Sequence, residues 1–215
     1  MILYFILFSL IGFIPYVSVF IGLQLKPQFI KRIMPKTILL FVIGASFKLF
    51  MISVVLPELQ GHNVQTFLAT MFINSVEFIV FKHNFIKNKV KNTEKGNIIA
   101  FGWAAMYAFA TSILVFISNS RSYELEIKHL TFALERVSFL FVYFAMERVV
   151  LSMNPQTSIT GLDLKQQLIV LMLGLPSAIS SLDSNINNIL ALVSSILIWA
   201  LTRKLEIYNQ DKKNN

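Results

Sequence analysis

Four ionisable side chains lie inside long apolar stretches of this sequence, and these residues are the best placed to do chemistry. They are Lys48, Glu77, Glu135 and Arg136. A charge within a lipid bilayer is costly unless it is paired, and such residues often mark ion or proton paths. Because Lys48 and Glu135 have similar depths within their stretches, the sequence predicts that they form an ion pair. Glu77 is closer to the end of its stretch and is predicted to reach the surface beside Lys82.

Two roles remain open for the predicted Lys48 to Glu135 pair. A structural ion pair that fixes the register of two helices is favoured over a path for ions or protons. Pro15 and Pro176 interrupt two of the apolar stretches, and some transporters unwind a helix at such a point to bind substrate. Kinks that accommodate helix packing are the commoner reason for a proline within a membrane helix.

Other catalytic and metal-binding signals are poor. The three histidines, His62, His83 and His129, fall in separate predicted loops without the spacing of a zinc site. Asp163 follows Gly161, which loosely resembles the motif of intramembrane aspartyl proteases, but Asp183 is predicted at the opposite membrane face. With no cysteine, the chain has no thiol chemistry. We therefore expect no catalytic residue, no cofactor and no metal, and a lipid-modifying enzyme would have only the isolated histidines to use.

The elements that position these residues are predicted from composition. Of 215 residues, 55% are hydrophobic and 14% are charged, whereas soluble domains contain about 25% charged residues. The apolar residues fall into seven stretches, at 2–23, 38–56, 64–81, 98–117, 130–146, 168–182 and 186–201. Since about 20 residues of helix cross a bilayer, the predicted fold is an all-α membrane protein, a single domain over 1–215 with about seven transmembrane helices. The last two stretches are short, and the alternative is an interfacial hairpin with five true spans.

The distribution of basic residues predicts the orientation. Fifteen of the 19 Lys and Arg residues lie in the first, third and fifth loops and in the C-terminal tail. Cytoplasmic loops carry such an excess, so we expect a cytosolic C-terminus and a lumenal N-terminus, with the first stretch retained as a span. The net charge of +8 is therefore attributed to these loops and not to nucleic-acid binding.

The fourth stretch carries a row of small side chains at i, i+4 spacing. The row consists of Ala100, Ala104, Ala108 and Ser112. Small residues let two membrane helices approach closely, so this face is expected to be packed. A contact within the chain is favoured over a docking face for a partner subunit.

The order of several residues resembles the transmembrane protein 147 family. The resembling segments are Phe13 to Tyr16, Leu40 to Val42 with Lys48 and Pro57, Gly102 to Ala104, Tyr123 to Lys128, and Glu135. The resemblance covers nearly the whole chain and is weakest in the last third, where Glu147, Arg148 and the loop at Pro155 depart from the pattern.

This resemblance implies a function. The family supplies a non-catalytic, multi-pass scaffold subunit of the BOS complex in the endoplasmic reticulum membrane. There it assembles with nicalin and the nodal modulator protein and associates with the Sec translocon during insertion of multi-pass proteins. A distant likeness to the γ-secretase scaffold subunit gives a similar fold with another assembly. The alternative from another class is a secondary transporter or channel that uses Lys48, Glu77 and Glu135.

Overall fold

The structure, a computed structural model, describes residues 13–55, 63–90, 92–119, 127–152, 172–180 and 185–214. Within these ranges every regular element is a helix and there is no strand, which confirms the all-α prediction for this part of the chain. A short helix over Phe13–Gly22 precedes the labelled elements. These are α2 (Pro27–Val55), α3 (Asn63–Lys87), α4 (Thr93–Asn119), α5 (Ile127–Ser152), α7 (Leu175–Ser180) and α8 (Asn185–Asn214).

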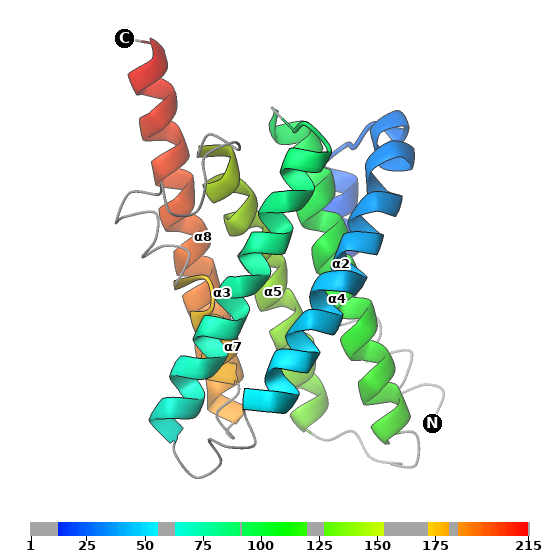
Figure 1. The fold of residues 1–215 in the computed structure, drawn as a ribbon, viewed down its shortest axis with the longest axis vertical. Helices are drawn as coiled ribbons and strands as arrows, with labels where there is room; N and C mark the ends of the chain where they lie inside the picture. Colours follow the sequence, from blue (N-terminus) through cyan, green and yellow to red (C-terminus); the bar gives the residue numbers. More distant parts are fainter. Residues whose placement is uncertain are drawn as a thin grey trace.

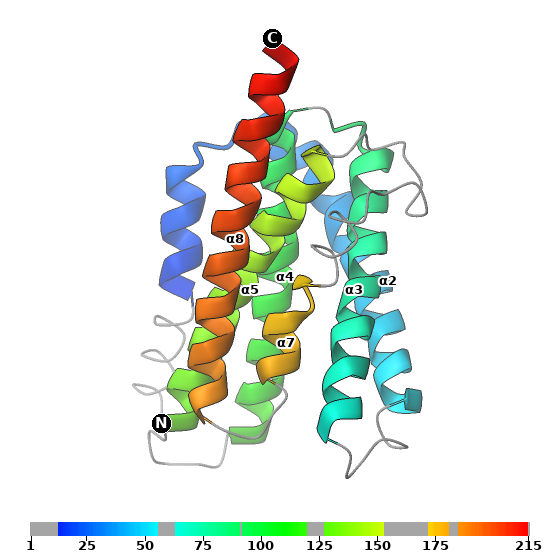
Figure 2. The same ribbon diagram turned by 90° about the vertical axis from the view of Figure 1, so that its left-hand side faces the viewer.

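The long helices run up and down beside one another (Figures 1 and 2). α5 packs against α4 and α8, and α2 packs against α3 and α4. The five long helices α2, α3, α4, α5 and α8 have 25 to 30 residues, which corresponds to about 40 Å at the helical rise. Within the described ranges, the segments Pro27–Val54 and Thr93–Ile113 are both long and apolar enough to cross a membrane.

The helices extend beyond the apolar stretches that predicted them. α3 continues to Lys87, six residues past the predicted end, and α8 continues to Asn214, so that it projects beyond the rest of the bundle (Figure 1). The backbone hydrogen bonds of a helix are local and do not depend on lipid. A polar residue therefore ends an apolar stretch without ending the helix.

The sixth predicted stretch differs more. In its described part, a turn at Leu173 and Gly174 precedes the six-residue helix α7, so the helix is interrupted before Pro176 and not at it. A Cβ at Gly174 would collide with the backbone carbonyl of Met71 on α3, which shows how closely this turn approaches α3. Pro176 lies in the first turn of α7, where a missing N–H costs no helical hydrogen bond.

Aromatic side chains form the centre of the bundle. Trp103 of α4 is fully buried, and the rings of Phe41 and Phe81 meet it edge to face at 5.5 and 5.4 Å. Phe81 also stacks with Tyr143 of α5 at 6.2 Å. Edge-to-face and offset pairs of this kind add to the stability gained from burial alone. Trp103 therefore lies where α2, α3, α4 and α5 meet.

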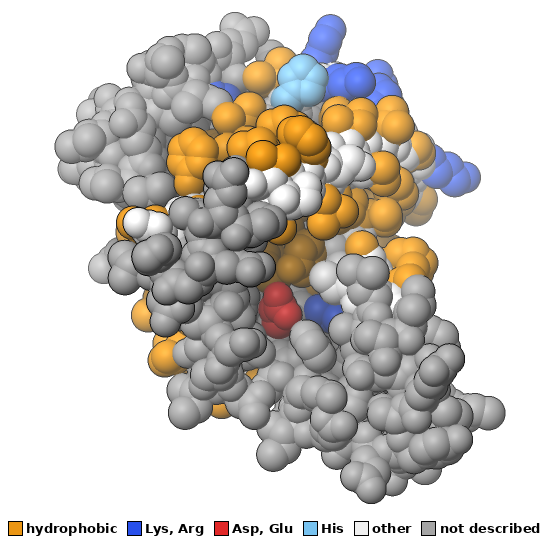
Figure 3. Space-filling model, turned by 60° about the horizontal axis from the view of Figure 1, so that its bottom comes forward, with side chains coloured by type: hydrophobic (Ala, Val, Ile, Leu, Met, Phe, Trp, Pro, Cys, Tyr) orange, Lys and Arg blue, Asp and Glu red, His pale blue; other side chains and the backbone are white. Residues whose placement is uncertain are grey.

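The outward faces of the bundle are apolar. Residues exposed by more than half of their surface include Leu39, Leu49, Phe50, Leu68, Phe72, Phe109, Ile189, Leu190, Leu197 and Leu201. Figure 3 shows hydrophobic side chains over one such face, with Lys and Arg side chains gathered at one end of it. Large contiguous apolar surfaces are rare on soluble monomers and are typical of contact with lipid or with other proteins.

Candidate functional site

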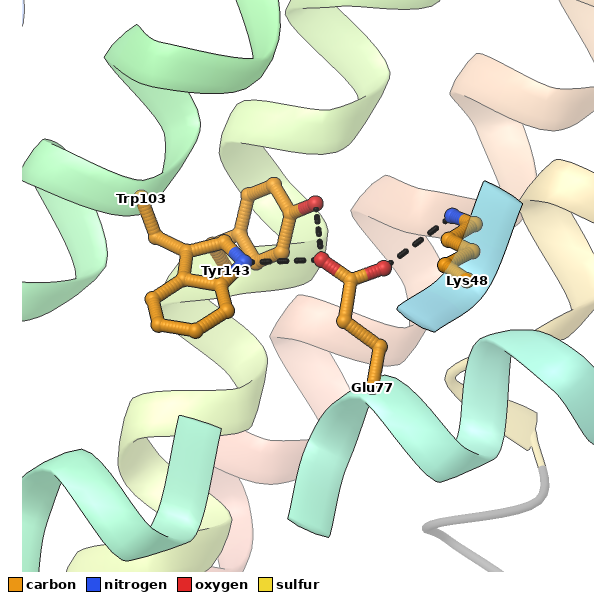
Figure 4. A network of polar contacts seen from close by, with 4 residues as sticks. All are labelled: Lys48, Glu77, Trp103 and Tyr143. Atoms are coloured by element: carbon orange, nitrogen blue, oxygen red, sulfur yellow. Dashed lines mark hydrogen bonds and ion pairs between the residues drawn. The ribbon is translucent and has the colours of Figure 1, made fainter. Parts of the chain in front are cut away.

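Two charged side chains of neighbouring helices, Lys48 and Glu77, form an ion pair inside the described bundle. Nζ of Lys48 on α2 donates to Oε2 of Glu77 on α3 at 3.0 Å, and the two side chains are 16% and 7% exposed. Figure 4 shows the ammonium and the carboxylate facing each other between the two helices. Pairing offsets the large cost of removing both charges from water.

The other oxygen of Glu77 is also bound. Oε1 accepts hydrogen bonds from the indole Nε1 of Trp103 at 2.7 Å and from the hydroxyl of Tyr143 at 2.8 Å. These donors come from α4 and α5, so one carboxylate connects four helices (Figure 4). Hydrogen bonds to an ionised acceptor are about twice as strong as those between neutral groups. We call Lys48, Glu77, Trp103 and Tyr143 the Glu77 cluster.

Two aromatic rings surround the ammonium of Lys48. Its Nζ lies 5.8 Å from the ring centre of Tyr107 and 6.0 Å from that of Phe139, and these two rings are 4.1 Å apart. A cation within about 6 Å of an aromatic face is attracted by the π electrons. The half-buried Lys48 is therefore held by an anion and by two rings.

The predicted partner of Lys48 was wrong: Lys48 pairs with Glu77 and not with Glu135. The prediction measured depth from the end of the apolar stretch, but α3 continues for ten residues after Glu77. Glu77 is therefore about 15 Å from the helix end at the helical rise, and Lys82 is itself buried. The prediction that Glu77 reaches the surface beside Lys82 fails for the same reason.

Glu135 and Arg136 lie next to the Glu77 cluster on α5. Glu135 is half-buried, and Lys48 and Arg136 both attract it electrostatically. Arg136 is 1% exposed, and its backbone carbonyl accepts a hydrogen bond of 2.7 Å from the Tyr16 hydroxyl. This bond connects the helix over Phe13–Gly22 to α5.

Little open space adjoins the ion pair. The cavity there has a volume of about 10 Å³, and its lining includes Gly44, Phe47, Ile73 and Val80 besides the pair itself. Such a volume holds about one water molecule. With the end of the molecule at the bottom of Figure 1 turned toward the viewer, an acidic and a basic side chain are visible in a hollow (Figure 3).

The small-residue row of α4 is packed inside the chain. Ala100, Ala104 and Ala108 have no exposed surface, and Ser112 is half-buried, with its hydroxyl donating to the Ala108 carbonyl. The helices that α4 contacts most are α5 and α2. The close approach allowed by these side chains is therefore used within the bundle.

Two further polar clusters were missed by the sequence prediction. In the first, the Asn84 amide donates to the Thr37 hydroxyl at 3.1 Å, and the Asn88 amide donates to Asn84 Oδ1 at 2.6 Å. In the second, the side-chain nitrogen of Asn97 donates to both oxygens of Glu147 at 2.9 and 3.1 Å. A polar residue inside or at the edge of an apolar stretch was the available signal, but its partner depends on the fold.

Metal and protease candidates gain no support. Within the described ranges, no three His, Asp or Glu residues lie close enough to hold a metal ion. His83 is exposed on α3. His62, Asp163 and Asp183 lie outside the described residues, as does Pro57.

Comparisons with protein-family models and with curated proteins find no match to this chain. The resemblance to the transmembrane protein 147 family therefore rests on the residues that carry it. Three of these residues, Tyr16, Lys48 and Trp103, make the polar contacts between helices described above.

Proposed function

We propose that this chain is a non-catalytic scaffold subunit of a membrane complex. The supporting observation is the Glu77 cluster, in which both carboxylate oxygens are occupied by groups of the same chain. A general acid or base needs an atom free to reach a substrate. The Glu77 carboxylate, with both oxygens bound by side chains of other helices, stabilises the packing of the bundle. A scaffold subunit needs such a rigid bundle to hold its partners in place.

The proposed setting is the endoplasmic reticulum membrane, with seven spans, a lumenal N-terminus and a cytosolic C-terminus. The apolar outward faces favour lipid as the surroundings. The start of α2, the turn between α3 and α4 and the end of α8 lie at one end of the bundle (Figure 1). Exposed basic residues there include Lys31, Arg32, Lys36, Lys87 and Lys89, and an excess of positive charge is typical of the cytosolic side.

The proposed partners follow from the family resemblance. They are a nicalin-like subunit, a nodal-modulator-like subunit and the Sec translocon, with lipids around the bundle, and the proposed role is the biogenesis of multi-pass membrane proteins. If the γ-secretase scaffold is the better comparison, the same bundle would assemble with a different set of subunits.

Purification from native membranes tests this proposal. The chain, tagged at its C-terminus, is extracted in a mild detergent, and the proteins that co-purify are identified by mass spectrometry. We expect a large single-span lumenal protein together with translocon components. Purification as a stable monomer or homodimer that binds a small substrate would overturn the scaffold proposal, and recovery of γ-secretase subunits would favour the other assembly.

A transporter or channel is the second candidate, because an intramembrane ion pair adjoins another carboxylate, Glu135. Lys48→Met separates the two functions. A transporter should lose flux in reconstituted vesicles while its fold and abundance persist. A scaffold should instead show lower abundance or weaker assembly with its partners, without any flux to lose.

A further inference from the structure

Five exposed cations lie at one end of the neighbouring helices α2 and α3. Lys31, Arg32 and Lys36 are near the start of α2, Lys87 is the last residue of α3, and Lys89 follows it. The two helices pack against each other and run in opposite directions, so the start of α2 and the end of α3 lie at the same end of the bundle (Figure 1). We call these five side chains the basic face.

The basic face is not used in contacts between the described helices. Nearby cations are engaged, because Lys26 pairs with Glu94 at 3.2 Å and the Lys95 ammonium lies 5.2 Å from the ring centre of Phe29. By contrast, no side chain of the basic face forms an ion pair within the part of the chain that the structure describes. Its five charges therefore point to a partner outside the bundle.

Side chains outside the described ones cannot remove this excess of positive charge. Residues 153–171, which follow α5, include one acidic and one basic residue, Asp163 and Lys165. Residues 204–215 include two acidic and three basic residues. An acidic residue of either segment that paired with the basic face would leave a basic residue of its own segment unpaired. The other acidic residues without a described side chain lie in connections between helix ends at the opposite end of the bundle, and they are Glu58, Glu124, Glu126 and Asp183.

Exposed apolar side chains of the same two helices border the basic face. On α2, Leu39 and Ile43 follow Lys36 at i+3 and i+7 and are more than half exposed. On α3, Ile79 precedes Lys87 at i−8 and is 46% exposed. Residues at these spacings share one face of a helix. Each helix therefore has an outward face that is apolar along its middle and basic at this end.

We propose that the basic face binds the phosphate groups of anionic phospholipids. Arg32 and Lys36 are one helical turn apart and repel each other, and a phosphate between them would lower that repulsion. The planar guanidinium group also matches the geometry of phosphate oxygens. A lipid is favoured over RNA or free phosphate because only a lipid would also contact the apolar residues next to the charges. This inference rests on the proposed embedding of the chain in a membrane, and not on its proposed partners.

Fluorescence quenching by brominated lipids tests the site. The chain contains no cysteine, so one introduced cysteine can carry a fluorescent label. Leu39→Cys places the label next to the basic face, and Leu68→Cys places a control label on an exposed position of α3 near its other end. Each labelled protein is reconstituted into phosphatidylcholine vesicles with a small fraction of brominated phosphatidylserine or brominated phosphatidylcholine. We expect brominated phosphatidylserine to be about fivefold enriched at position 39 and not enriched at position 68.

Substitutions show whether the basic face causes this enrichment. Arg32→Gln combined with Lys36→Gln should remove most of it, and Lys87→Gln should remove part of it. Lys26→Gln is the matched control, because it removes an exposed charge at the same end that is already paired with Glu94, and it should change the enrichment little. Lys36→Arg retains the charge and should retain the enrichment. Helix content measured by circular dichroism verifies that each variant is folded.

The failures of the lipid site and of the membrane embedding are distinguishable. Equal enrichment at positions 39 and 68, or enrichment that persists in the double variant, overturns the lipid site and leaves the embedding intact. Absence of quenching by either lipid at both positions overturns both. Inorganic phosphate, compared with sodium chloride at equal ionic strength, should not compete, and labelled single-stranded RNA should not bind the protein in pure phosphatidylcholine vesicles. If phosphate abolishes the enrichment, or if RNA binds and the double variant loses that binding, the lipid proposal is wrong.

Discussion

The Lys48 ammonium lies 3.0 Å from the Glu77 carboxylate on the neighbouring helix. The residues that the sequence marked as candidates for chemistry therefore hold α2 and α3 together. Neither charge is left to lipid or to solvent. Because Trp103 and Tyr143 bind the same carboxylate, the pair belongs to the interior of the bundle, and changes to it should affect stability before any other property.

Loss of one charge of the pair should destabilise the bundle. Glu77→Gln leaves the half-buried Lys48 ammonium without its anion, and we expect a loss of about 3 kcal/mol in the free energy of unfolding. Unfolding of the purified protein by sodium dodecyl sulfate in mixed micelles measures this. Lys48→Met combined with Glu77→Gln should recover part of the loss, because no unpaired charge then remains. A double variant as unstable as the sum of the single variants would contradict the pairing.

The hydroxyl of Tyr143 should contribute more to stability than that of Tyr16. Tyr143 donates to a carboxylate, whereas Tyr16 donates to a backbone carbonyl. Both rings are buried, so Tyr→Phe removes only the hydroxyl at each position. We expect losses of about 2 kcal/mol for Tyr143→Phe and about 1 kcal/mol for Tyr16→Phe in the same unfolding assay. Equal losses would indicate that Glu77 is not ionised.

Gly96 should not tolerate a methyl group. A Cβ at this position would lie 2.5 Å from Oε1 of Glu147, whereas a Cβ at Gly22 would meet nothing within 4 Å. Gly96→Ala should therefore displace Glu147 from Asn97. We expect the free energy of unfolding to fall by an amount on the order of 1–3 kcal/mol, which lowers the midpoint of thermal unfolding by several degrees. Gly22→Ala serves as the control and should leave the midpoint unchanged or slightly raised. Similar midpoints for the two variants would argue against the close packing of α4 and α5.

Enlargement of the small-residue row should separate α4 from its neighbours. Ala104 is fully buried, whereas Ala110 on the same helix is exposed. Ala104→Leu should lower stability by about 2 kcal/mol through overpacking, and Ala110→Leu should have little effect in detergent. Thermal unfolding followed by circular dichroism compares the two. If Ala104→Leu were tolerated while assembly with partners was lost, the row would be an outer docking face.

Much of the helical organisation could be predicted from the sequence. Apolar length located the helices that the structure describes, and the i, i+4 spacing of Ala100, Ala104 and Ala108 identified a packed face. Lys48 and Glu77 stood out because ionisable groups are rare in apolar stretches. These features depend on one helix at a time, which is why a single sequence reveals them.

The partners of these residues could not be predicted in the same way. The sequence placed Glu77 close to the end of a helix because the depth was measured from the end of the apolar stretch at residue 81. The helix α3 itself continues to Lys87, so Glu77 lies deeper than predicted. The contacts of Trp103 and Tyr143 with Glu77 depend on how α3, α4 and α5 are rotated about their axes. Thr37 and Asn84 were missed because they lie just outside the predicted stretches 38–56 and 64–81, whereas α2 and α3 continue through both positions.

The position of the ion pair along the chain bears on how the protein is made. Lys48 and Glu77 are 29 residues apart and lie on consecutive helices, so a ribosome completes both before it synthesises Trp103 or Tyr143. In the proposed membrane setting, each helix alone would carry an uncompensated charge into the bilayer, at a cost of about 3 kcal/mol. Entering together, α2 and α3 can neutralise each other at once. The first half of the chain can thus leave an insertion channel as an electrically balanced hairpin, to which the later helices add their hydrogen bonds.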